Sequence, residues 1–176
     1  MPLLVLSSSL NPESNSRVLA REAHRALAAN GHEAVLLDLR DLALPVCDGG
    51  PAYAHPDVAK ARAAVAAADG ILAATPVYNY DANAALKNLV ELTGKAWENK
   101  VVGFACAAGG ASSYMSIMGL AGSLMLDFRC VIVPRFVYAT ERDFAGGTIS
   151  NPAIAERTAA LARELARMAA ALRSNP

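Results

Sequence analysis

The sequence has no excess of charge of either sign and lacks the features that mark secreted or membrane proteins. Its 176 residues include 16 Lys and Arg against 16 Asp and Glu, so we expect no basic surface for nucleic acid. The first residues, MPLLVLSSSL, have neither the charged segment nor the long apolar segment of a secretory signal peptide. No apolar run approaches the roughly 20 residues that cross a bilayer. We therefore expect a cytoplasmic protein that binds neither nucleic acid nor a membrane.

Cysteines are also few, and their positions give no sign of a disulfide framework or a redox pair. Cys47, Cys106 and Cys130 form no C-x-x-C motif and have no regular spacing. Cys106 and Cys130 lie in apolar segments, which favours buried free thiols. The acidic cluster of Asp38, Asp41 and Asp48 likewise lacks the spacing of metal ligands. We expect no metal site and assign this acidic cluster to a surface loop.

The sequence does contain apolar runs of strand length that alternate with longer segments of helical periodicity. The runs do not alternate polar with apolar residues, which is typical of parallel strands covered on both faces. The expected strands are residues 3–7, 34–39, 70–75, 101–107 and 129–133, and the expected helices are residues 16–30, 57–68, 83–93, 113–128 and 152–173. Residues 40–55 and 139–150 contain Gly, Pro or Asp and are expected to be surface loops.

This alternation predicts a single domain, residues 1–176, of the α/β class. Right-handed crossovers favour a three-layer, doubly wound fold in which a five-stranded parallel sheet has the order 2-1-3-4-5. In such sheets a ligand binds beyond the carboxyl ends of the strands, where neighbouring connections diverge. The loops after the first, third and fourth strands are therefore the candidate site.

The first of these loops, SSLNPESNS, holds six Ser and Asn residues within nine positions, directly before a helix. The free N–H groups of a first helical turn attract an anion, and hydroxyl and amide groups complete a phosphate site. The candidate residues are Ser9, Asn11, Ser14, Asn15 and Ser16. The alternative is that Ser14 or Ser16 only caps the helix. The loop has neither G-x-x-x-x-G-K-[ST] nor G-x-G-x-x-G, so a P-loop or a dinucleotide motif is not expected.

The second loop, TPVYNYDAN, leaves a buried strand through Pro76, which stiffens the chain at that point. The backbone N–H groups of residues 77–80 are then expected to face the crevice, where Tyr78 and Tyr80 would wall a flat heterocycle. The alternative for both tyrosines is half-buried packing at a helix start. Asn83 is expected to cap the helix that follows.

The third loop, AGGASSY, places Gly109 and Gly110 across the same crevice. Without side chains they let the backbone approach a ring closely. The alternative is an ordinary turn between a strand and a helix.

Together the three loops resemble those of the NAD(P)H-dependent FMN reductases, a family with a flavodoxin-like fold. SLNPESNSRVLA resembles the phosphate loop of that family. TPVYNYDANAALKNLVE is similar to its T-P-x-Y-N signature, which a helix carrying L-K-N follows, and AGGASSY matches its Gly-Gly loop. The S-x4-S-x-S spacing is also similar to that of flavin reductases from two-component monooxygenase systems.

The resemblance implies a set of FMN-binding residues in this chain. The phosphate would be held by Ser9, Ser14 and Ser16, with Asn11 and Asn15 nearby, and the isoalloxazine ring by Pro76, Val77, Tyr78, Asn79, Tyr80, Gly109 and Gly110. Many members carry arginine where this chain has Asn11, so the phosphate charge would be less neutralised here.

The resemblance also implies a reaction, hydride transfer from nicotinamide C4 of NADPH or NADH to flavin N5 and then to an acceptor such as free flavin or a quinone. Backbone N–H groups stabilise the charge of a reduced flavin without an acid or base side chain, so we name no catalytic residue. Two alternatives stay open. One is a flavodoxin-type electron carrier, although such carriers are usually strongly acidic. The other is a flavin-free α/β domain that binds a different phosphorylated molecule.

The segment YMSIMGLAGSLMLDF is apolar nearly all round, more than one buried helix face requires. We interpret it as the interface of a homodimer or homotetramer that borders the flavin cleft. The alternative is a helix enclosed entirely by its own domain.

Overall fold

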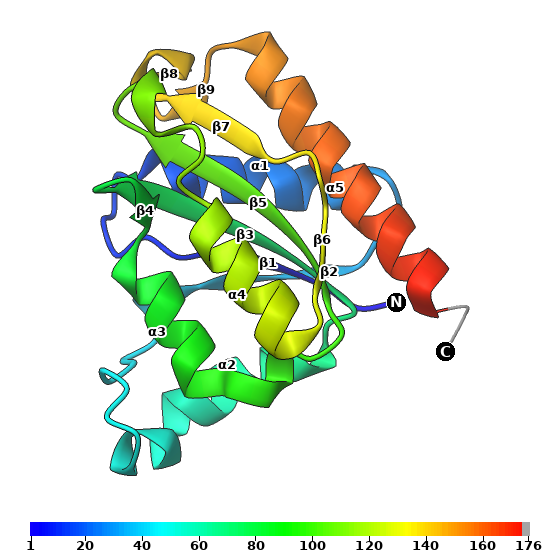
Figure 1. Cartoon of the computed structure of the whole chain (residues 1–176). Helices are drawn as coiled ribbons and strands as arrows, with labels where there is room; N and C mark the ends of the chain where they lie inside the picture. The colour runs from blue at the N-terminus through cyan, green and yellow to red at the C-terminus, as the bar shows by residue number, and fades with distance from the viewer. Residues whose placement is uncertain (174–176) are drawn as a thin grey trace.

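The apolar runs of the sequence form the central sheet of the computed structural model, which describes residues 1–173 (Figure 1). The parallel strands of this sheet are β1 (Leu3–Ser7), β2 (Ala34–Asp38), β3 (Gly70–Tyr78), β5 (Val101–Ala108), β6 (Val131–Ile132) and β7 (Val137–Thr140). They pair in parallel in the order β2-β1-β3-β5-β6, and β7 also pairs with β5. The predicted order 2-1-3-4-5 is confirmed.

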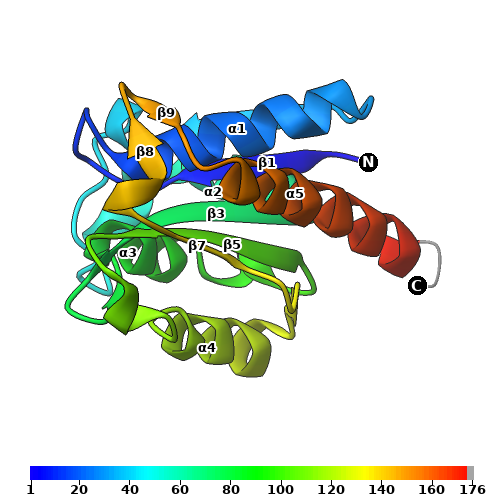
Figure 2. The ribbon, with the colours of Figure 1, turned by 90° about the horizontal axis from the view of Figure 1, so that it is seen from above.

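Helices cover both faces of the sheet, which gives the three predicted layers. The helices are α1 (Asn15–Ala29), α2 (Pro56–Ala67), α3 (Ala84–Thr93), α4 (Met118–Phe128) and α5 (Pro152–Arg173). Figure 2 shows α1 and α5 on one side of the sheet and α4 on the other, and α2 and α3 share the core on the side of α4. The carboxyl ends of the strands lie at the end of the sheet far from both termini.

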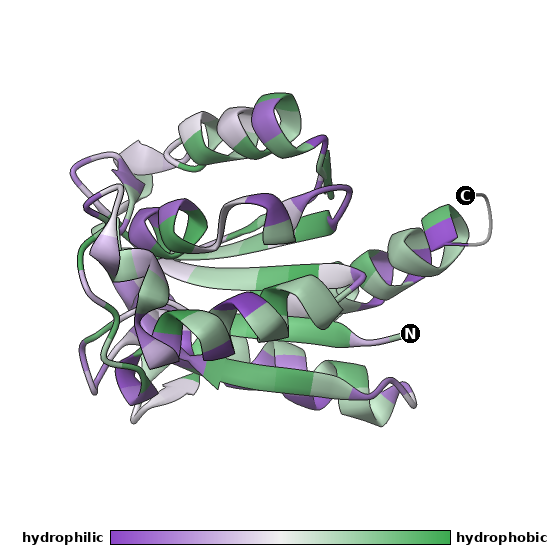
Figure 3. Ribbon diagram, turned by 90° about the horizontal axis from the view of Figure 1, so that it is seen from below, coloured by the Kyte–Doolittle hydropathy of each residue, from purple (hydrophilic) through white to green (hydrophobic). Residues whose placement is uncertain are grey.

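The core has two halves because successive strand residues point to opposite faces. Leu3 and Val5 pack among α1 and α5, whereas Leu4 and Leu6 pack among α2, α3 and α4. All four are essentially buried, and burying a side chain of this kind contributes roughly 1.5–3 kcal/mol. Figure 3 shows the strands of the central sheet mostly in the colour of hydrophobic residues. Burial on both faces explains why β1, β3 and β5 show no polar–apolar alternation.

The fifth strand, expected at residues 129–133, is in fact two short strands on the sheet edge. β6 pairs with the start of β5, and β7 pairs with its end at Ala105–Ala108. Pro134 lies between them and has no N–H to donate to a ladder. Arg129, at the expected strand start, instead ends α4 in a left-handed conformation. The predicted strand therefore contains β6 but begins two residues before it. The prediction missed β7.

Two further expectations need correction. Residues 139–150 are not a plain loop, because β8 (Phe144–Ala145) and β9 (Thr148–Ile149) form a hairpin closed by Gly146 and Gly147. Both glycines have positive φ, 55° and 73°, as a tight hairpin turn requires. The helix expected from residue 113 begins at Met118, after a short 3-10 turn at Ala111–Ser113.

Cys106 and Cys130 are buried free thiols, as predicted. Burial raises the pKa of the Cys106 thiol to about 12 and that of Cys130 to about 11. Within residues 1–173 no group of His, Cys, Asp and Glu side chains is arranged to hold a metal ion. None of the described helices is both long and apolar enough to cross a bilayer.

Candidate functional site

The first loop is folded against the start of α1 by its own side chains. Ser14 caps the helix, since its Oγ accepts a hydrogen bond from the Ser16 backbone N–H at 3.2 Å and lies 2.8 Å from Ser16 Oγ. Ser9 Oγ accepts from the backbone N–H of Asn11 at 3.2 Å, and Asn11 Oδ1 accepts from that of Glu13 at 3.1 Å. The capping alternative is thus observed for Ser14. The polar groups nevertheless gather at one helix N-terminus.

The second loop is a tight hairpin rather than an open turn. β3 continues through Pro76 to Tyr78, and β4 (Asp81–Ala82) pairs back onto it in antiparallel register. Asn79 and Tyr80 form the turn with φ values of 51° and 66°, the left-handed region that non-glycine residues rarely occupy. This register turns part of the 77–80 backbone toward β4, so the expectation that all four N–H groups face the crevice is wrong.

The tyrosines of this hairpin are accessible to solvent. Tyr78 and Tyr80 are each 54% exposed, so about half of each side chain is open to a ligand. Residues held in a strained backbone conformation tend to occur at functional sites.

Asn83 joins the second loop to the first. It is the N-cap residue of α3, as expected, but its side chain makes no capping hydrogen bond. Its Oδ1 accepts from Ser8 Oγ at 2.7 Å and from Thr75 Oγ1 at 3.1 Å, and its Nδ2 donates to the Ser8 carbonyl at 2.8 Å. Ser8, Thr75 and Asn83 are all buried. The position was predicted correctly, whereas the role of the side chain was not.

The third loop follows β5 and leaves open space beside it. A Cβ atom added at Gly109 or Gly110 would have no neighbour within 4 Å. Tyr138 Oη donates to the Gly110 carbonyl at 2.5 Å, which ties this loop to β7. Tyr114 packs against Phe136 and Tyr138, with ring centroids 5.0 and 5.5 Å away.

The three loops meet at one open cleft of about 180 Å³. Seven of the predicted residues line it: Asn11, Ser14, Asn15, Ser16, Pro76, Tyr78 and Gly109. A larger apolar cavity of about 440 Å³ lies between α3 and the chain after β2, and of the three loops only the first, through Leu10, contributes a lining residue to it. The smaller cleft is the better candidate, because it holds the polar groups that the sequence brings to the carboxyl ends of the strands.

The other predicted residues surround the cleft without lining it. Ser9 is buried within the first loop. Val77 packs against the core on the α3 side. Asn79 and Tyr80 stand at the hairpin turn, and Gly110 is exposed beyond Gly109.

Four lining residues were not predicted. Ala107 and Ala108 end β5 directly before the glycines, so their place next to a predicted loop was a usable signal. Glu13 lies inside the predicted phosphate loop, but its charge made it an unexpected member of an anion site. Glu141 follows β7, and no signal for it existed because that strand was not predicted.

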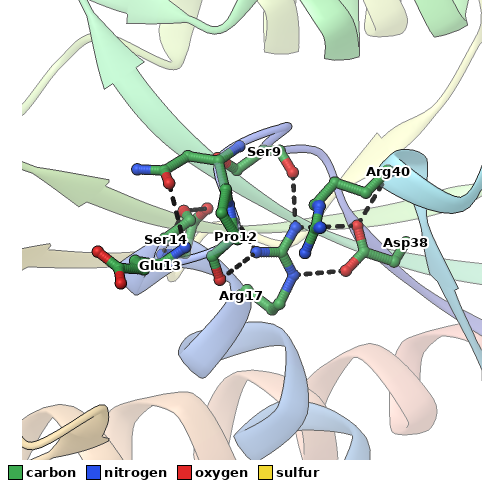
Figure 4. Close-up of polar contacts among 9 residues, drawn as sticks. Ser9, Pro12, Glu13, Ser14, Arg17, Asp38 and Arg40 are labelled. Atoms are coloured by element: carbon green, nitrogen blue, oxygen red, sulfur yellow. Dashed lines mark hydrogen bonds and ion pairs between the residues drawn. The ribbon is translucent and has the colours of Figure 1, made fainter.

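A partly buried ion pair between Arg17 and Asp38 lies next to the first loop (Figure 4). Arg17 Nε lies 2.5 Å from Asp38 Oδ2. Partial burial by itself raises the pKa of the Asp38 carboxyl, but hydrogen bonds from Arg17 and from the Arg40 backbone, with the nearby positive charges, lower that pKa overall. From the sequence we expected Asp38 to lie in a surface loop with no specific partner. In the structure it is instead the ion-pair partner of Arg17.

Comparison with known proteins identifies the family to which this fold and these loops belong. The family model described as NADPH-dependent FMN reductase matches residues 1–144. The chain belongs to the NADPH-dependent FMN reductase family.

One similar protein is the NAD(P)H-dependent FAD/FMN reductase of Geobacillus thermodenitrificans. It is 32% identical over 142 residues, which cover 79% of this chain and 77% of the relative. The family therefore makes this chain an oxidoreductase of a type that uses a flavin with NAD(P)H as electron donor.

Solved structures agree on the flavodoxin-like fold of this FMN reductase family member. An oxidoreductase from Corynebacterium diphtheriae superimposes with a TM-score of 0.77 at 24% identity, covering 96% of each chain. A flavodoxin from the domain Archaea superimposes with a TM-score of 0.68 at 10% identity, covering 96% of this chain and 99% of that one. At these identities the likeness shows the fold alone.

Proposed function

We propose that the cleft binds FMN and that the chain is an NAD(P)H-dependent FMN reductase that passes electrons to a small-molecule acceptor. One observation carries the proposal. Three loops far apart in the sequence, each with a family-like motif, lie around one cleft at the carboxyl ends of the strands. A doubly wound sheet binds its ligand at that edge.

The chemistry of the cleft fits the phosphate of FMN. Ser14, Asn15 and Ser16 stand at the N-terminus of α1, where the helix dipole favours an anion. Hydroxyl and amide donors would hold the phosphate, and each such hydrogen bond to a charged group contributes about 1.5–3 kcal/mol. No Lys or Arg is found among the described residues that line the cleft. The phosphate would therefore be held by neutral donors.

The rest of the cleft fits a flat ring. Pro76 and Tyr78 from the second loop and Gly109 from the third border it, with Val77, Asn79, Tyr80 and Gly110 around them. FMN in this position would accept a hydride from NADPH or NADH and deliver electrons to free flavin, a quinone or a similar acceptor. The residues of this chain would orient the ring and stabilise its charge through backbone groups, without an acid or base side chain.

Purified protein tests the proposal. We expect NAD(P)H oxidation that depends on FMN, measured at 340 nm with NADPH and NADH in turn, and a visible flavin spectrum after FMN is added. A protein that binds FMN but accepts electrons only from dithionite would be a flavodoxin-type carrier, although the balanced charge of this chain disfavours that function. A protein that binds no flavin would contradict the proposal. It would favour the alternative of a flavin-free domain that binds a different phosphorylated molecule.

The proposed enzyme is a homodimer or homotetramer. α4 buries Leu120 and Leu124 against its own sheet but leaves Met118, Met125 and Leu126 exposed. The helix is thus not enclosed by its own domain. A second copy of the chain would cover this apolar face.

A further inference from the structure

Arg17 is a charged side chain buried beneath the first loop. It lies in the first turn of α1 and is only 4% exposed. Burying a guanidinium is costly unless its N–H groups find partners. Its partners therefore show what the side chain does.

All five N–H donors of the Arg17 guanidinium have partners (Figure 4). One Nη donates to the carbonyls of Asn11 and Pro12 at 2.5 and 2.9 Å. The other Nη donates to the Ser9 carbonyl at 2.8 Å and to Asp38 Oδ1 at 3.2 Å. Nε donates to Asp38 Oδ2 at 2.5 Å. No donor is left over for a bound phosphate, so Arg17 acts on the loop and not on the ligand.

These bonds fix which way the peptide groups of the first loop point. In a trans peptide the C=O and the following N–H point in opposite directions. The carbonyls of Ser9, Asn11 and Pro12 point toward Arg17, which keeps three partly negative oxygens away from a phosphate. The N–H groups of Leu10 and Glu13, in the same peptide units as two of those carbonyls, point the opposite way.

Asp38 holds the guanidinium in this orientation. It ends β2, the neighbour of the strand that leads into the first loop. Its carboxylate meets Arg17 through both oxygens, and its side chain is only 18% exposed. A planar guanidinium paired in this way has little rotational freedom.

We propose that Arg17, oriented by Asp38, is a positioning residue that shapes the first loop for the phosphate of FMN. This inference rests on the proposed function, because it presumes that FMN occupies the cleft. It distinguishes two roles for a buried arginine near an anion. A positioning residue needs the forked guanidinium, whereas a residue that only neutralises charge needs a cation of any shape.

The test compares the binding of FMN with that of riboflavin, which has the ring but no phosphate. Flavin titrations monitored by fluorescence give both dissociation constants for the wild type, Arg17→Gln, Arg17→Lys and Arg21→Gln. Arg21 is the matched control, since it is exposed on the same helix. We expect Arg17→Gln and Arg17→Lys each to weaken FMN binding roughly tenfold or more, the loss of one hydrogen bond to a charged group. Riboflavin binding and the Arg21 control should change less than about twofold.

Each result decides one of the two claims. If lysine restores FMN affinity, or if both Arg17 variants bind FMN as tightly as the Arg21 control, the positioning role is overturned while the proposed function stands. If the wild type binds neither flavin, the proposed function fails and the inference fails with it. Where Arg17→Gln does not fold, Asp38→Asn keeps the side-chain volume and leaves Arg17 present. We expect Asp38→Asn to weaken FMN binding selectively, and an unchanged ratio of FMN to riboflavin affinity would overturn the inference.

Discussion

Negative charge at the mouth of the proposed FMN site is the least expected property of its residues. Glu13 and Glu141 both line the cleft, and Asn11 beside them is uncharged. A phosphate bound there would meet two carboxylates and no lining cation. Hydrogen bonds and the α1 dipole would have to outweigh this repulsion. The balance between them decides how FMN affinity responds to salt.

We expect FMN affinity to stay level or to rise as salt is raised from about 0.02 to about 0.5 M, because salt screens the repulsion from Glu13 and Glu141. Isothermal titration calorimetry at several salt concentrations measures the dissociation constant of FMN. The matched control is the Glu13→Gln, Glu141→Gln double variant, which should bind FMN more tightly at low salt. A tenfold fall in wild-type affinity with added salt would show that a cation holds the phosphate instead.

The lowered pKa of Asp38 makes the stability of the folded protein depend on pH. Its pKa is lowered in the folded state, so its contribution to stability is present above its unfolded pKa of about 3.9 and is lost as pH falls through the lowered value. The difference in unfolding free energy between wild type and Asp38→Asn should therefore be constant from about pH 7 to pH 5 and should shrink below about pH 4. Urea unfolding at each pH measures it. A difference that vanishes above pH 5 would contradict the lowered pKa.

At the scale of elements, the strands of five or more residues were predictable, and the short strands that follow α4 were less so. β1 and α5 match the predicted residues, and β2, β3 and β5 differ only at their ends, because each of these strands contains a continuous apolar run. The divided edge strand and the β8–β9 hairpin were missed, because short strands paired on one side leave a weak pattern. The residues of the candidate site were likewise predicted only in part. The loops that leave buried strands were found, whereas Glu141, which follows the edge strand β7, was not.

The link between β1 and β3 through Asn83 predicts a coupled loss. Asn83→Ala would leave the hydroxyls of Ser8 and Thr75 without this partner, so we expect a cost of about 2–3 kcal/mol in unfolding free energy and weaker FMN binding. Chemical unfolding and flavin titration measure the two effects. Asn88→Ala is the control, because Asn88 bonds the chain at Pro45 and Cys47, outside the cleft. If both variants change FMN affinity equally, the network does not connect the two loops of the site.

The third loop offers a pair of glycines that separates fold from site. A Cβ atom at Gly109 or Gly110 meets no atom within 4 Å, and neither glycine has positive φ, so both alanine variants should keep wild-type melting temperatures. Only Gly109 lines the cleft. We expect Gly109→Ala to lower FMN affinity roughly tenfold and Gly110→Ala to leave it within about twofold. Unchanged FMN affinity in Gly109→Ala would contradict a ring that is bordered by Gly109.

At the scale of the whole molecule, two surface properties bear on function. The first is the absence of net charge, which gives no long-range attraction toward a charged partner and suits an enzyme that meets small molecules. The second is the exposed apolar face of α4, where Leu126 is 89% exposed. A face of this kind on a folded protein is typical of an interface between subunits.

We expect the protein to elute as a dimer or tetramer of the 18.3 kDa chain, and Leu126→Glu together with Met118→Glu to shift it toward the monomer, because a charge cannot be buried unpaired in an apolar interface. Size-exclusion chromatography with light scattering measures the mass. Leu172→Glu is the matched control, since Leu172 is exposed at the far end of α5. A wild-type protein that is monomeric at micromolar concentration would contradict the interface.

A crystal structure of the protein grown with FMN is the most direct test of the proposed site. We expect the phosphate to lie at the start of α1 against Ser14 and Ser16, and the ring to lie between the hairpin at Tyr78 and the backbone of Gly109. Density for FMN in any other part of the molecule, or an empty cleft at saturating FMN, would contradict the proposal that these three loops form one flavin site.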